Sequence, residues 1–512
     1  MNLALREKIS SHIKASSKEE LRGGVILLVL KLICLLMAIA YFAVFLYITI
    51  SRINYPFALE WMEGTSYVQV YRILSGRLLY VEPSLDYVPL IYPPLYYYLS
   101  ALIAKLIGLS FLPLRLVSLL STLGCMGLIF LIVRKLQPSV FAQIIAIGLF
   151  SATFKIGGAW FDIARVDMLA LFLALMSIFC LQFSKNSSYF LSGLLMALSC
   201  LTKQTFLILL VATSIYSFFL DRKRTWIVII SSLTIYAVSY MALNYVHAGW
   251  YKYFIYDLST GHTEKLNIAG AGQLFLSLIF KPISLIFLFT VAYFIQITRE
   301  RKSFSQMSIL LIVGATLALS WLGIVNPGAF NNVIIPSYAI LSIITGIFLA
   351  KNLSRNDLSK FLKAGILTLT MLQFFLLRYP IKDQIPTVDD LHAGQALLQE
   401  IKAQPGDVYV PYHPEMMLSV GKRSYADWIS MKELKGGFGD ETGLKEWTKV
   451  KIQLRTAFRT GKFMMIIVDG ANFLGSPEAY YQAKEIVYSD DHTFYPVTGW
   501  QTRPTIMYIP GN

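Results

Sequence analysis

Short clusters of basic residues separate the long apolar runs of this 512-residue chain, and their positions limit its possible folds more than any other feature. Hydrophobic residues occupy 56% of the sequence, yet the positive charges gather at alternate ends of the apolar runs. The clusters are Arg134-Lys135, Asp221 to Arg224, Arg299 to Lys302, and Lys351 to Lys363. Because membrane proteins keep basic loops in the cytoplasm, this pattern predicts a polytopic α-helical membrane protein.

A net charge of +15 would suggest nucleic-acid binding in a soluble protein, but here it accompanies apolar spans. We therefore assign the charge to membrane topology and contact with anionic membrane lipids, and expect no nucleic-acid partner. The four cysteines lie within apolar runs, where a free thiol behaves as a small hydrophobic group. The apolar run 25–50 exceeds the length of a signal-peptide core and is expected to remain as the first span.

Placing the basic clusters in the cytoplasm, with a helix of about 20 apolar residues for each crossing, predicts about eleven transmembrane helices. The N-terminus is then inside, the C-terminus is outside, and residues 51–113 form the first outer loop. Residues 92–109 are apolar enough to cross, but a crossing there would invert every later loop. We expect an interfacial helix there instead, because tyrosine side chains favour the headgroup region.

The sequence divides near residue 380. Residues 1–380 form the predicted transmembrane domain, and residues 381–512 mix charged and apolar residues in the manner of a soluble α/β domain, which the topology places outside the cytoplasm. The pattern of apolar residues predicts an amphipathic helix over residues 389–403. Strands are predicted near residues 407–410, 463–468, 485–488 and 505–509.

Two carboxylates follow the first span. Glu60 and Glu63 would share one face of a helix if the segment after them is helical, because they lie three residues apart. Paired carboxylates raise one another's pKa and can supply a general base. Acidic residues are also favoured at the positive end of a helix, so a purely structural role stands as the alternative.

Further charges lie on the predicted outer side. Asp167 begins an apolar span, where a charge needs a partner, and Arg165 is the expected partner. With Asp162 they form a cluster that fits a structural ion pair as well as a substrate site. Lys203 lies at the tip of a short outer hairpin, and its ammonium group suits a phosphate oxygen. A lysine whose charge merely reaches the interface is the alternative.

Two weaker candidates remain. His262 lies in a later outer loop, where a lone histidine is more often an ordinary loop residue than a ligand or base. Asn332 could bind sugar hydroxyls, but asparagine is also a common turn residue. The sequence contains no nucleotide-binding or zinc-protease motif in a supporting context, so nucleotide-driven chemistry has no support.

The first outer loop resembles that of the GT-C glycosyltransferases, which include protein O-mannosyltransferases and the aminoarabinose transferase of lipid A. The matching segments are Met62-Glu63-Gly64, Tyr71 to Tyr80, Tyr92-Pro93-Pro94 to Tyr98, Arg115 to Ser118, and Gly193 to Thr205. Glu63 matches the second acidic position of the family's opening motif. Met62 replaces the first, so Glu60 is expected to take its place. Tyr92 stands where several relatives have lysine.

The resemblance implies an enzyme that moves a sugar from a polyprenyl-phosphate donor to a hydroxyl of a lipid, glycan or protein on the outer face of a cell's cytoplasmic membrane. Glu63 or Glu60 would accept the hydroxyl proton, and Lys203 and Arg165 would neutralise the departing phosphate. Direct displacement would invert the anomeric carbon. A divalent metal cation is compatible with this chemistry but not required. Asp162, Asp167, Tyr92 and His262 complete the expected substrate site.

Two other functions compete with this reading. A transporter or flippase of a lipid-linked sugar would also carry charges within a helical bundle, but transporters often show matched halves that this sequence lacks. A membrane scaffold that presents the C-terminal domain would leave the outer carboxylates and Lys203 without a purpose. The enzyme is therefore the favoured interpretation.

Overall fold

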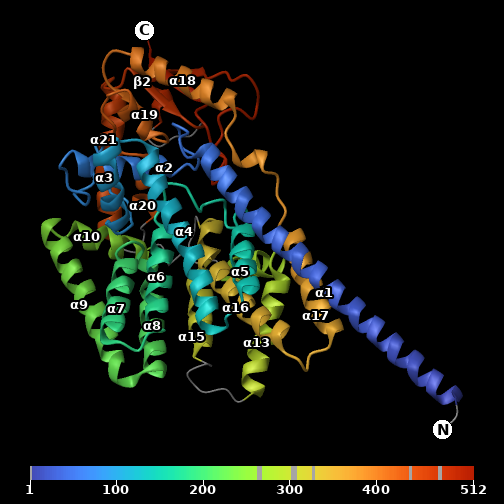
Figure 1. The fold of residues 1–512 in the computed structure, drawn as a ribbon. Coiled ribbons are helices and arrows are strands. Elements are labelled where there is room, and N and C mark those ends of the chain that lie inside the picture. Colours follow the sequence, from blue (N-terminus) through green and yellow to red (C-terminus); the bar gives the residue numbers. More distant parts are fainter. Residues whose placement is uncertain are drawn as a thin grey trace.

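The computed structural model describes residues 3–261, 268–300, 308–325, 329–436, 441–470 and 476–511. A bundle of apolar helices forms one end of the molecule, and a region of helices and short strands covers the other end (Figure 1). The helices of the bundle are α1 (Leu3–Arg52), α4 (Phe111–Leu136), α5 (Val140–Ala152), α6 (Asp167–Cys180), α7 (Asn186–Cys200), α8 (Leu207–Leu220), α9 (Arg222–Val246), α12 (Ile268–Phe280), α13 (Ser284–Arg299), α15 (Ile309–Val325), α16 (Ile335–Ser354) and α17 (Lys360–Leu376).

Four of the described helices are long and apolar enough to cross a membrane: most of α1, all of α4 and α9, and α16 with the 3₁₀ turn before it. Helices α12 and α13 would add a fifth span if their 87° bend belongs to one broken crossing. The remaining apolar helices are 10–17 residues long. The fold is thus mostly helical with long apolar helices, and the expected number of about eleven spans stays a prediction.

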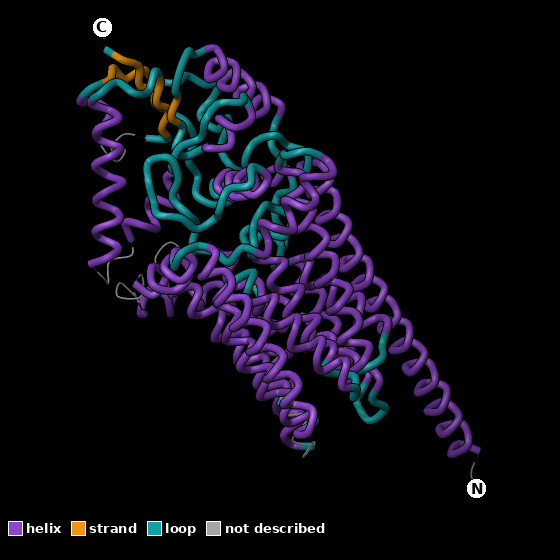
Figure 2. The backbone as a smooth tube through the Cα atoms, turned by 90° about the vertical axis from the view of Figure 1, so that its left-hand side faces the viewer, coloured by secondary structure: helices purple, strands orange, loops and turns teal. Residues whose placement is uncertain are grey.

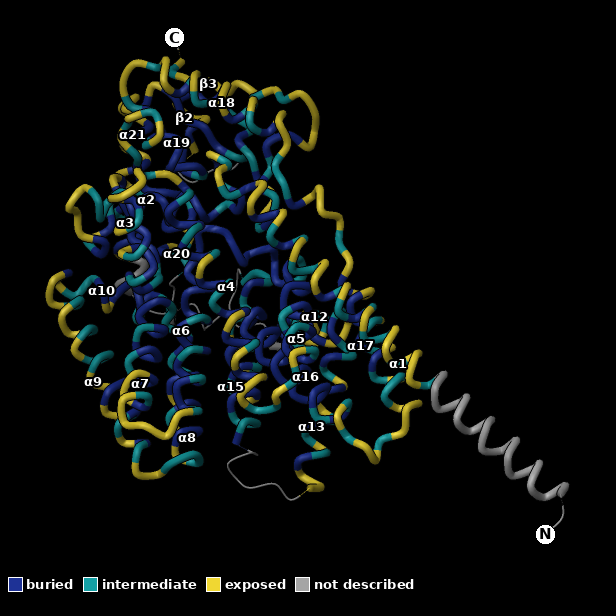
Figure 3. Tube along the Cα trace, viewed as in Figure 1, coloured by how far each residue is buried: buried dark blue, intermediate teal, exposed yellow. Residues whose placement is uncertain are grey.

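The outer helices of the bundle expose apolar surface, as lipid contact requires. Only 11% of the apolar window of α1 and 17% of that of α9 is buried, whereas 94% of the window that contains α16 is buried (Figure 3). Helix α16 therefore forms the centre of the bundle. The connections α8–α9 and α16–α17, which carry basic clusters, both lie at the end of the bundle far from the strands (Figure 1).

The segment between α1 and α4 forms two short helices above the bundle, α2 (Glu63–Leu74) and α3 (Leu95–Ile107). Helix α3 has 13 residues. At 1.5 Å per residue it is too short to cross a hydrocarbon core of about 30 Å. Its buried face contains Tyr96 and Tyr97, and its opposite face exposes Leu102 and Leu106. Residues 95–107 thus form a short helix, and its place in the membrane interface stays a prediction; Tyr96 and Tyr97 are buried within the protein instead of facing headgroups.

The C-terminal region combines helices with one four-stranded sheet (Figure 2). The strand order is β1-β2-β4-β3, with β1 parallel to β2 and the other pairs antiparallel. The elements are α18 (Val388–Ala403), β1 (Val408–Tyr409), α19 (Pro414–Ser419), α20 (Trp428–Gly436), α21 (Glu441–Arg459), β2 (Met465–Val468), β3 (Tyr481–Glu485) and β4 (Ile506–Pro510). The strand expected near residues 485–488 is wrong in position, because β3 ends at Glu485, where the expected strand begins.

This region shares a hydrophobic core with the segment that follows α1. Tyr409 and Phe463 belong to the same buried cluster as Tyr67 and Tyr96. The isolated bridge between Glu60 and Thr498 links the two segments through the backbone as well. The C-terminal region is thus built directly onto the segment between α1 and α4.

Candidate functional site: a polar cavity between the helix bundle and the C-terminal region

Glu63 is held by four hydrogen-bond donors. Arg115, near the start of α4, donates from Nη2 to Oε2 at 2.7 Å and from Nε to Oε1 at 3.1 Å. The backbone N–H groups of Leu59 and Ala164 donate to the same carboxylate at 2.7 Å and 2.6 Å. Both charged side chains are 0% exposed. The pair therefore ties α2, α4 and the loop before α6 together.

Glu60 lies in a different environment from Glu63. Helix α2 begins at Glu63, so the expected shared helical face does not form. One Glu60 oxygen accepts a hydrogen bond from the Met62 backbone N–H at 3.1 Å. The other oxygen, Oε1, has no hydrogen-bond partner in the described part of the chain. Burial raises the pKa of Glu60 to about 8, although the positive charge of Arg165 opposes this shift.

Asp162 is paired with a residue that the sequence analysis did not single out. Arg52, the last residue of α1, donates from Nε to Asp162 Oδ2 at 2.9 Å and from Nη2 to Oδ1 at 2.5 Å. Arg52 also donates to the carbonyl oxygens of Ala159 and Gln384. The pair anchors the outer end of α1, and the described cavity lining includes neither of its residues.

A cavity of about 760 Å³ lies between the bundle and the C-terminal region. Its size falls within the range of about 300–1,000 Å³ that is typical of ligand sites. The lining comes from both sides: α6, α15, α16 and the turn before α8 on the bundle side, and α20 on the C-terminal side. Aromatic side chains form much of it, namely Trp61, Tyr92, Trp160, Phe206, Phe330 and Trp428.

Asp167 and Lys203 form an ion pair in the wall of this cavity. Lys203 Nζ lies 2.6 Å from Asp167 Oδ1, and the Asn332 amide donates to the same oxygen at 2.8 Å. The direct partner of Asp167 is therefore Lys203, and the expected pairing with Arg165 is wrong. Lys203 is only 13% exposed, so its position is more confined than that of a lysine reaching into the interface.

Arg165 contacts aromatic groups directly, and the carboxylates of Glu60 and Asp167 are close enough to act on its charge without forming an ion pair with it in the described part of the chain. Its Nη2 donates to the Tyr92 hydroxyl at 3.2 Å. Its guanidinium carbon lies 5.2 Å from the centre of the Tyr92 ring and 5.0 Å from that of Trp160. Such cation–π contacts position a charge without neutralising it. Tyr92 thus orients Arg165 in the cavity wall.

The cavity lining contains buried polar atoms that lack a hydrogen-bond partner among the described residues. They are Trp160 Nε1, Arg165 Nε, Asp167 Oδ2 and Gln204 Oε1. A buried polar group without a partner costs about 1–3 kcal/mol, so several in one place are unusual unless a ligand satisfies them. The cavity is therefore the best candidate for a binding site of a polar, anionic ligand.

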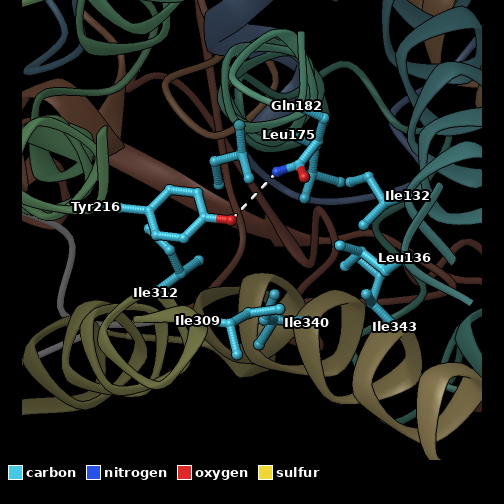
Figure 4. A pocket seen from close by; sticks show the side chains of 10 residues that line it. Ile132, Leu136, Leu175, Gln182, Tyr216, Ile309, Ile312, Ile340 and Ile343 are labelled. Carbon is cyan, nitrogen blue, oxygen red and sulfur yellow. Dashed lines mark hydrogen bonds between the residues drawn. The ribbon is translucent and has the colours of Figure 1, made fainter. Parts of the chain in front are cut away.

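A second pocket is too small for a substrate. It has a volume of about 20 Å³ and lies among apolar side chains of α4, α6, α15 and α16 (Figure 4). The Gln182 amide donates to the Tyr216 hydroxyl at 3.2 Å on one side of it. This volume holds about one water molecule.

Two expectations find no structural support here. His262 lies outside the described residues. Within the described ranges, no three His, Cys, Asp or Glu side chains are grouped at metal-binding distances, so these residues provide no ligand set for a divalent cation.

Sequence reasoning missed Arg52 and gave Arg115 no role, although one signal could have found both. Lysine and arginine are uncommon at the outer ends of spans, where the predicted topology places these two residues together with Arg165 and Lys203. Each of the four is paired with a carboxylate or lines the cavity. Asn332 was weighed low but binds Asp167 directly.

Comparison with known proteins agrees with this architecture. Residues 92–250 match the model of the family described as dolichyl-phosphate-mannose-protein mannosyltransferase. Comparison with curated proteins gives no match. Among solved structures, the chain is similar to ArnT from Cupriavidus metallidurans bound to undecaprenyl phosphate, with 12% identity and a TM-score of 0.59, over 92% of this chain and 97% of that one.

A second similar structure is the oligosaccharyltransferase AglB from Archaeoglobus fulgidus in complex with an inhibitory peptide and a dolichol-phosphate. Its identity to this chain is 12% and its TM-score 0.51, over 91% of this chain and 73% of that one. The resemblance to the GT-C membrane glycosyltransferases is therefore confirmed. The chain has their fold, and residues 92–250 carry the sequence pattern of one of their families.

Proposed function

We propose that this protein transfers a sugar from a polyprenyl-phosphate donor to a hydroxyl acceptor at the outer face of the membrane. The observation that carries the proposal is the cavity: it combines a cationic wall, aromatic surface and buried polar atoms without a described partner, at the helix ends that face the C-terminal region. ArnT, which has the same fold, was solved with undecaprenyl phosphate bound.

The donor phosphate lies against Lys203 and Arg165 in this proposal. Both side chains line the cavity, and Arg165 is positioned by aromatic contacts that leave its charge available. As the bond between the anomeric carbon and the phosphate oxygen breaks, negative charge grows on the departing phosphate. Cations already fixed at that place stabilise the transition state without having to reorganise.

The acceptor hydroxyl attacks the anomeric carbon from the side opposite to the phosphate, so the product has inverted configuration. Its proton passes to a carboxylate, and the polyprenyl phosphate leaves as an anion. We assign proton acceptance to Glu60, because one of its oxygens has no partner within the described ranges and its neighbours Trp61 and Met62 line the cavity. A pKa of about 8 makes this group a stronger base than an ordinary carboxylate.

Glu63 acts through Arg115 in this proposal. Its four donors fix the start of α2 and therefore the position of Glu60. Asp167 holds Lys203 in a comparable way, with Asn332 as a second support. Asp162 holds Arg52 at the end of α1. These carboxylates position the site rather than react.

The proposal places the N-terminus and the basic loops in the cytoplasm and the C-terminal region outside. This orientation can be tested with single cysteines, because the four native cysteines are all buried. Asn356→Cys, in the α16–α17 connection, should react with a membrane-impermeant maleimide only after the membrane is opened. Lys484→Cys, on β3, should react in intact spheroplasts. The reverse result would place the cavity on the cytoplasmic side.

The deciding experiment offers the purified full-length protein a set of undecaprenyl-phosphate sugars with mixed glycan and lipid acceptors. Mass spectrometry should detect release of undecaprenyl phosphate together with a glycosylated acceptor. A transporter or flippase would instead move the intact donor between leaflets of a vesicle and release no phosphate. Movement without bond cleavage would therefore replace the proposed function with that alternative.

A further inference from the structure

The wall of the cavity formed by α20 carries a second pair of cations. Lys432 and Lys435 both line the cavity and are exposed. Neither forms an ion pair with any carboxylate in the part of the chain that the structure describes. Glu433, the acidic residue of this wall, lies between them in the sequence. Together, four cationic side chains and two carboxylates line the cavity, which leaves an excess of positive charge.

Lys432 is held by two tryptophans at the edge of the cavity. Its Nζ lies 5.6 Å from the centre of the Trp61 ring and 5.7 Å from that of Trp500. The two rings meet edge to face, with centres 5.2 Å apart and an angle of 85°. Trp61 belongs to the cavity lining, whereas Trp500 is 48% exposed. An ammonium group and two indoles are thus arranged together where Trp61 and Lys432 line the cavity.

This arrangement matches an anionic sugar. An indole offers a large apolar face with a polar N–H, which suits the mixed apolar and hydroxylated surface of a pyranose ring. The ammonium group beside it recognises a phosphate or a carboxylate. Cation–π contact with the rings orients Lys432 while leaving its charge unneutralised.

The two cationic groups lie on different sides of the cavity. Arg165 and Lys203 belong to the bundle side, where a polyprenyl tail would lie in the membrane. Lys432 and Lys435 belong to α20, which lies between the bundle and the sheet region (Figure 1). Direct displacement requires the acceptor oxygen and the leaving phosphate on opposite sides of the anomeric carbon. If the donor phosphate binds on the bundle side, the acceptor is expected to bind at the wall formed by α20.

We propose that Lys432, Lys435, Trp61 and Trp500 form a binding site for the acceptor, and that the acceptor is a glycan bearing a phosphate or carboxylate group. The identification of this ligand as the acceptor rests on the proposed function. Independently of that function, we expect the protein to have two anion subsites with different ligands. The bundle subsite takes the polyprenyl phosphate, and the α20 subsite takes the anionic sugar.

Titration calorimetry on the purified full-length protein tests this with five probes: undecaprenyl phosphate, glucose 6-phosphate, glucuronate, glucose and inorganic phosphate. At least one of the two anionic sugars should bind about tenfold more tightly than glucose and than inorganic phosphate. Which of them binds more tightly identifies the phosphate or the carboxylate as the preferred charge.

Variants then separate the subsites. Lys432→Ala should weaken the anionic sugar about tenfold and leave undecaprenyl phosphate unchanged, and Lys203→Ala should do the reverse. Trp500→Ala should weaken the anionic sugar while leaving undecaprenyl phosphate unchanged. Lys402→Ala, an exposed lysine on α18 outside the cavity lining, is the matched control and should change neither affinity.

Two results would overturn the inference. One is a Lys432→Ala variant that loses undecaprenyl phosphate as strongly as the sugar, which would mean a single anion site. The other is wild-type protein that binds glucose or inorganic phosphate as tightly as both anionic sugars. Failure of the proposed function gives a different result: undecaprenyl phosphate would not bind, or would bind independently of Lys203. The sugar affinities of wild type and Lys432→Ala would still test the α20 subsite in that case.

Discussion

Two groups of buried charge lie at the ends of the helices that face the C-terminal region, and they differ in how completely their atoms are paired. In the first group, the Glu63 carboxylate accepts four hydrogen bonds, two of them from Arg115, and Arg115 also donates to backbone carbonyl oxygens. Arg52 likewise donates two hydrogen bonds to Asp162 and others to backbone carbonyl oxygens. In the second group, Arg165 and Asp167 each keep a buried atom without a partner among the described residues.

The difference separates structural charges from charges available to a ligand. Burying an ion pair is costly, and the cost is recovered only when geometry and hydrogen bonds are complete, as they are around Glu63. The incomplete group lines a large cavity, so the missing partners are groups that a substrate can supply. We therefore expect incomplete pairing, more than position along the helices, to mark the residues that bind a ligand.

The largest expected effect concerns the complete group. Arg115→Ala should lower stability by about 3–5 kcal/mol, because it leaves the Glu63 carboxylate buried without its counter-charge. We expect little folded protein, measured as the monodisperse fraction after solubilisation and as a lower Tm. Glu82→Ala, which breaks the exposed contact with Lys449, is the control and should leave Tm unchanged. A folded, active Arg115→Ala variant would show that this group does not hold the outer loop in place.

Glu60→Gln should have the second largest effect, and it should act on rate rather than on folding. Loss of a general base lowers turnover by about 10²–10⁴-fold. Since a base must be deprotonated, wild-type turnover should rise as the pH increases through about 8, and the variant should lack this dependence. A variant that keeps wild-type turnover and the same pH profile would remove Glu60 from the reaction.

The same residue makes a prediction about stability. Because the folded-state pKa of Glu60 is raised from its ordinary value of 4.5 to about 8, the folded protein holds the proton more tightly than the unfolded chain. Its contribution to stability is therefore fully present below pH 4.5 and is lost as the pH rises toward 8. Glu60→Gln should flatten this part of the Tm profile. An unchanged slope would indicate that Glu60 is solvated.

Asn332→Ala should have the smallest effect of the series. It removes one of the two donors to Asp167 Oδ1 and leaves the Lys203 ion pair in place. A single hydrogen bond to a charged group contributes about 1.5–3 kcal/mol, part of which water in the cavity can replace. We expect a loss of turnover of about tenfold or less, measured under saturating donor. A loss as large as that of Glu60→Gln would give Asn332 a direct role in the reaction.

The sequence predicted a large part of this molecule because hydropathy and charge act at the level of whole helices. The membrane-protein class, the short helix α3 and the choice of Lys203 as a candidate, which the structure places in the cavity lining, all follow from local composition. The pairing of the outer charges could not be predicted in this way. Asp167 meets Lys203 across 36 positions, and Glu63 meets Arg115 across 52, so both contacts depend on how the helices pack.

The role of the C-terminal region was also beyond sequence reasoning. No motif marks Lys432 or Trp500, and Trp61 lies far from both in the chain. They meet because residues 381–512 pack on the first outer loop through a shared core that includes Tyr409 and Tyr67. A compositional boundary near residue 380 thus gives no indication that the cavity is built from both sides of it.

The measurement that tests the central claim most directly is made on Lys203. Purified Lys203→Ala and Lys203→Arg should be compared with wild type for Tm, for affinity toward undecaprenyl phosphate and for turnover per folded molecule. If the incompletely paired group is the donor site, Lys203→Ala keeps a near-normal Tm but loses donor affinity and turnover, and Lys203→Arg recovers part of both because the charge is kept. A Lys203→Ala variant with reduced yield but normal affinity and turnover per folded molecule would contradict the account.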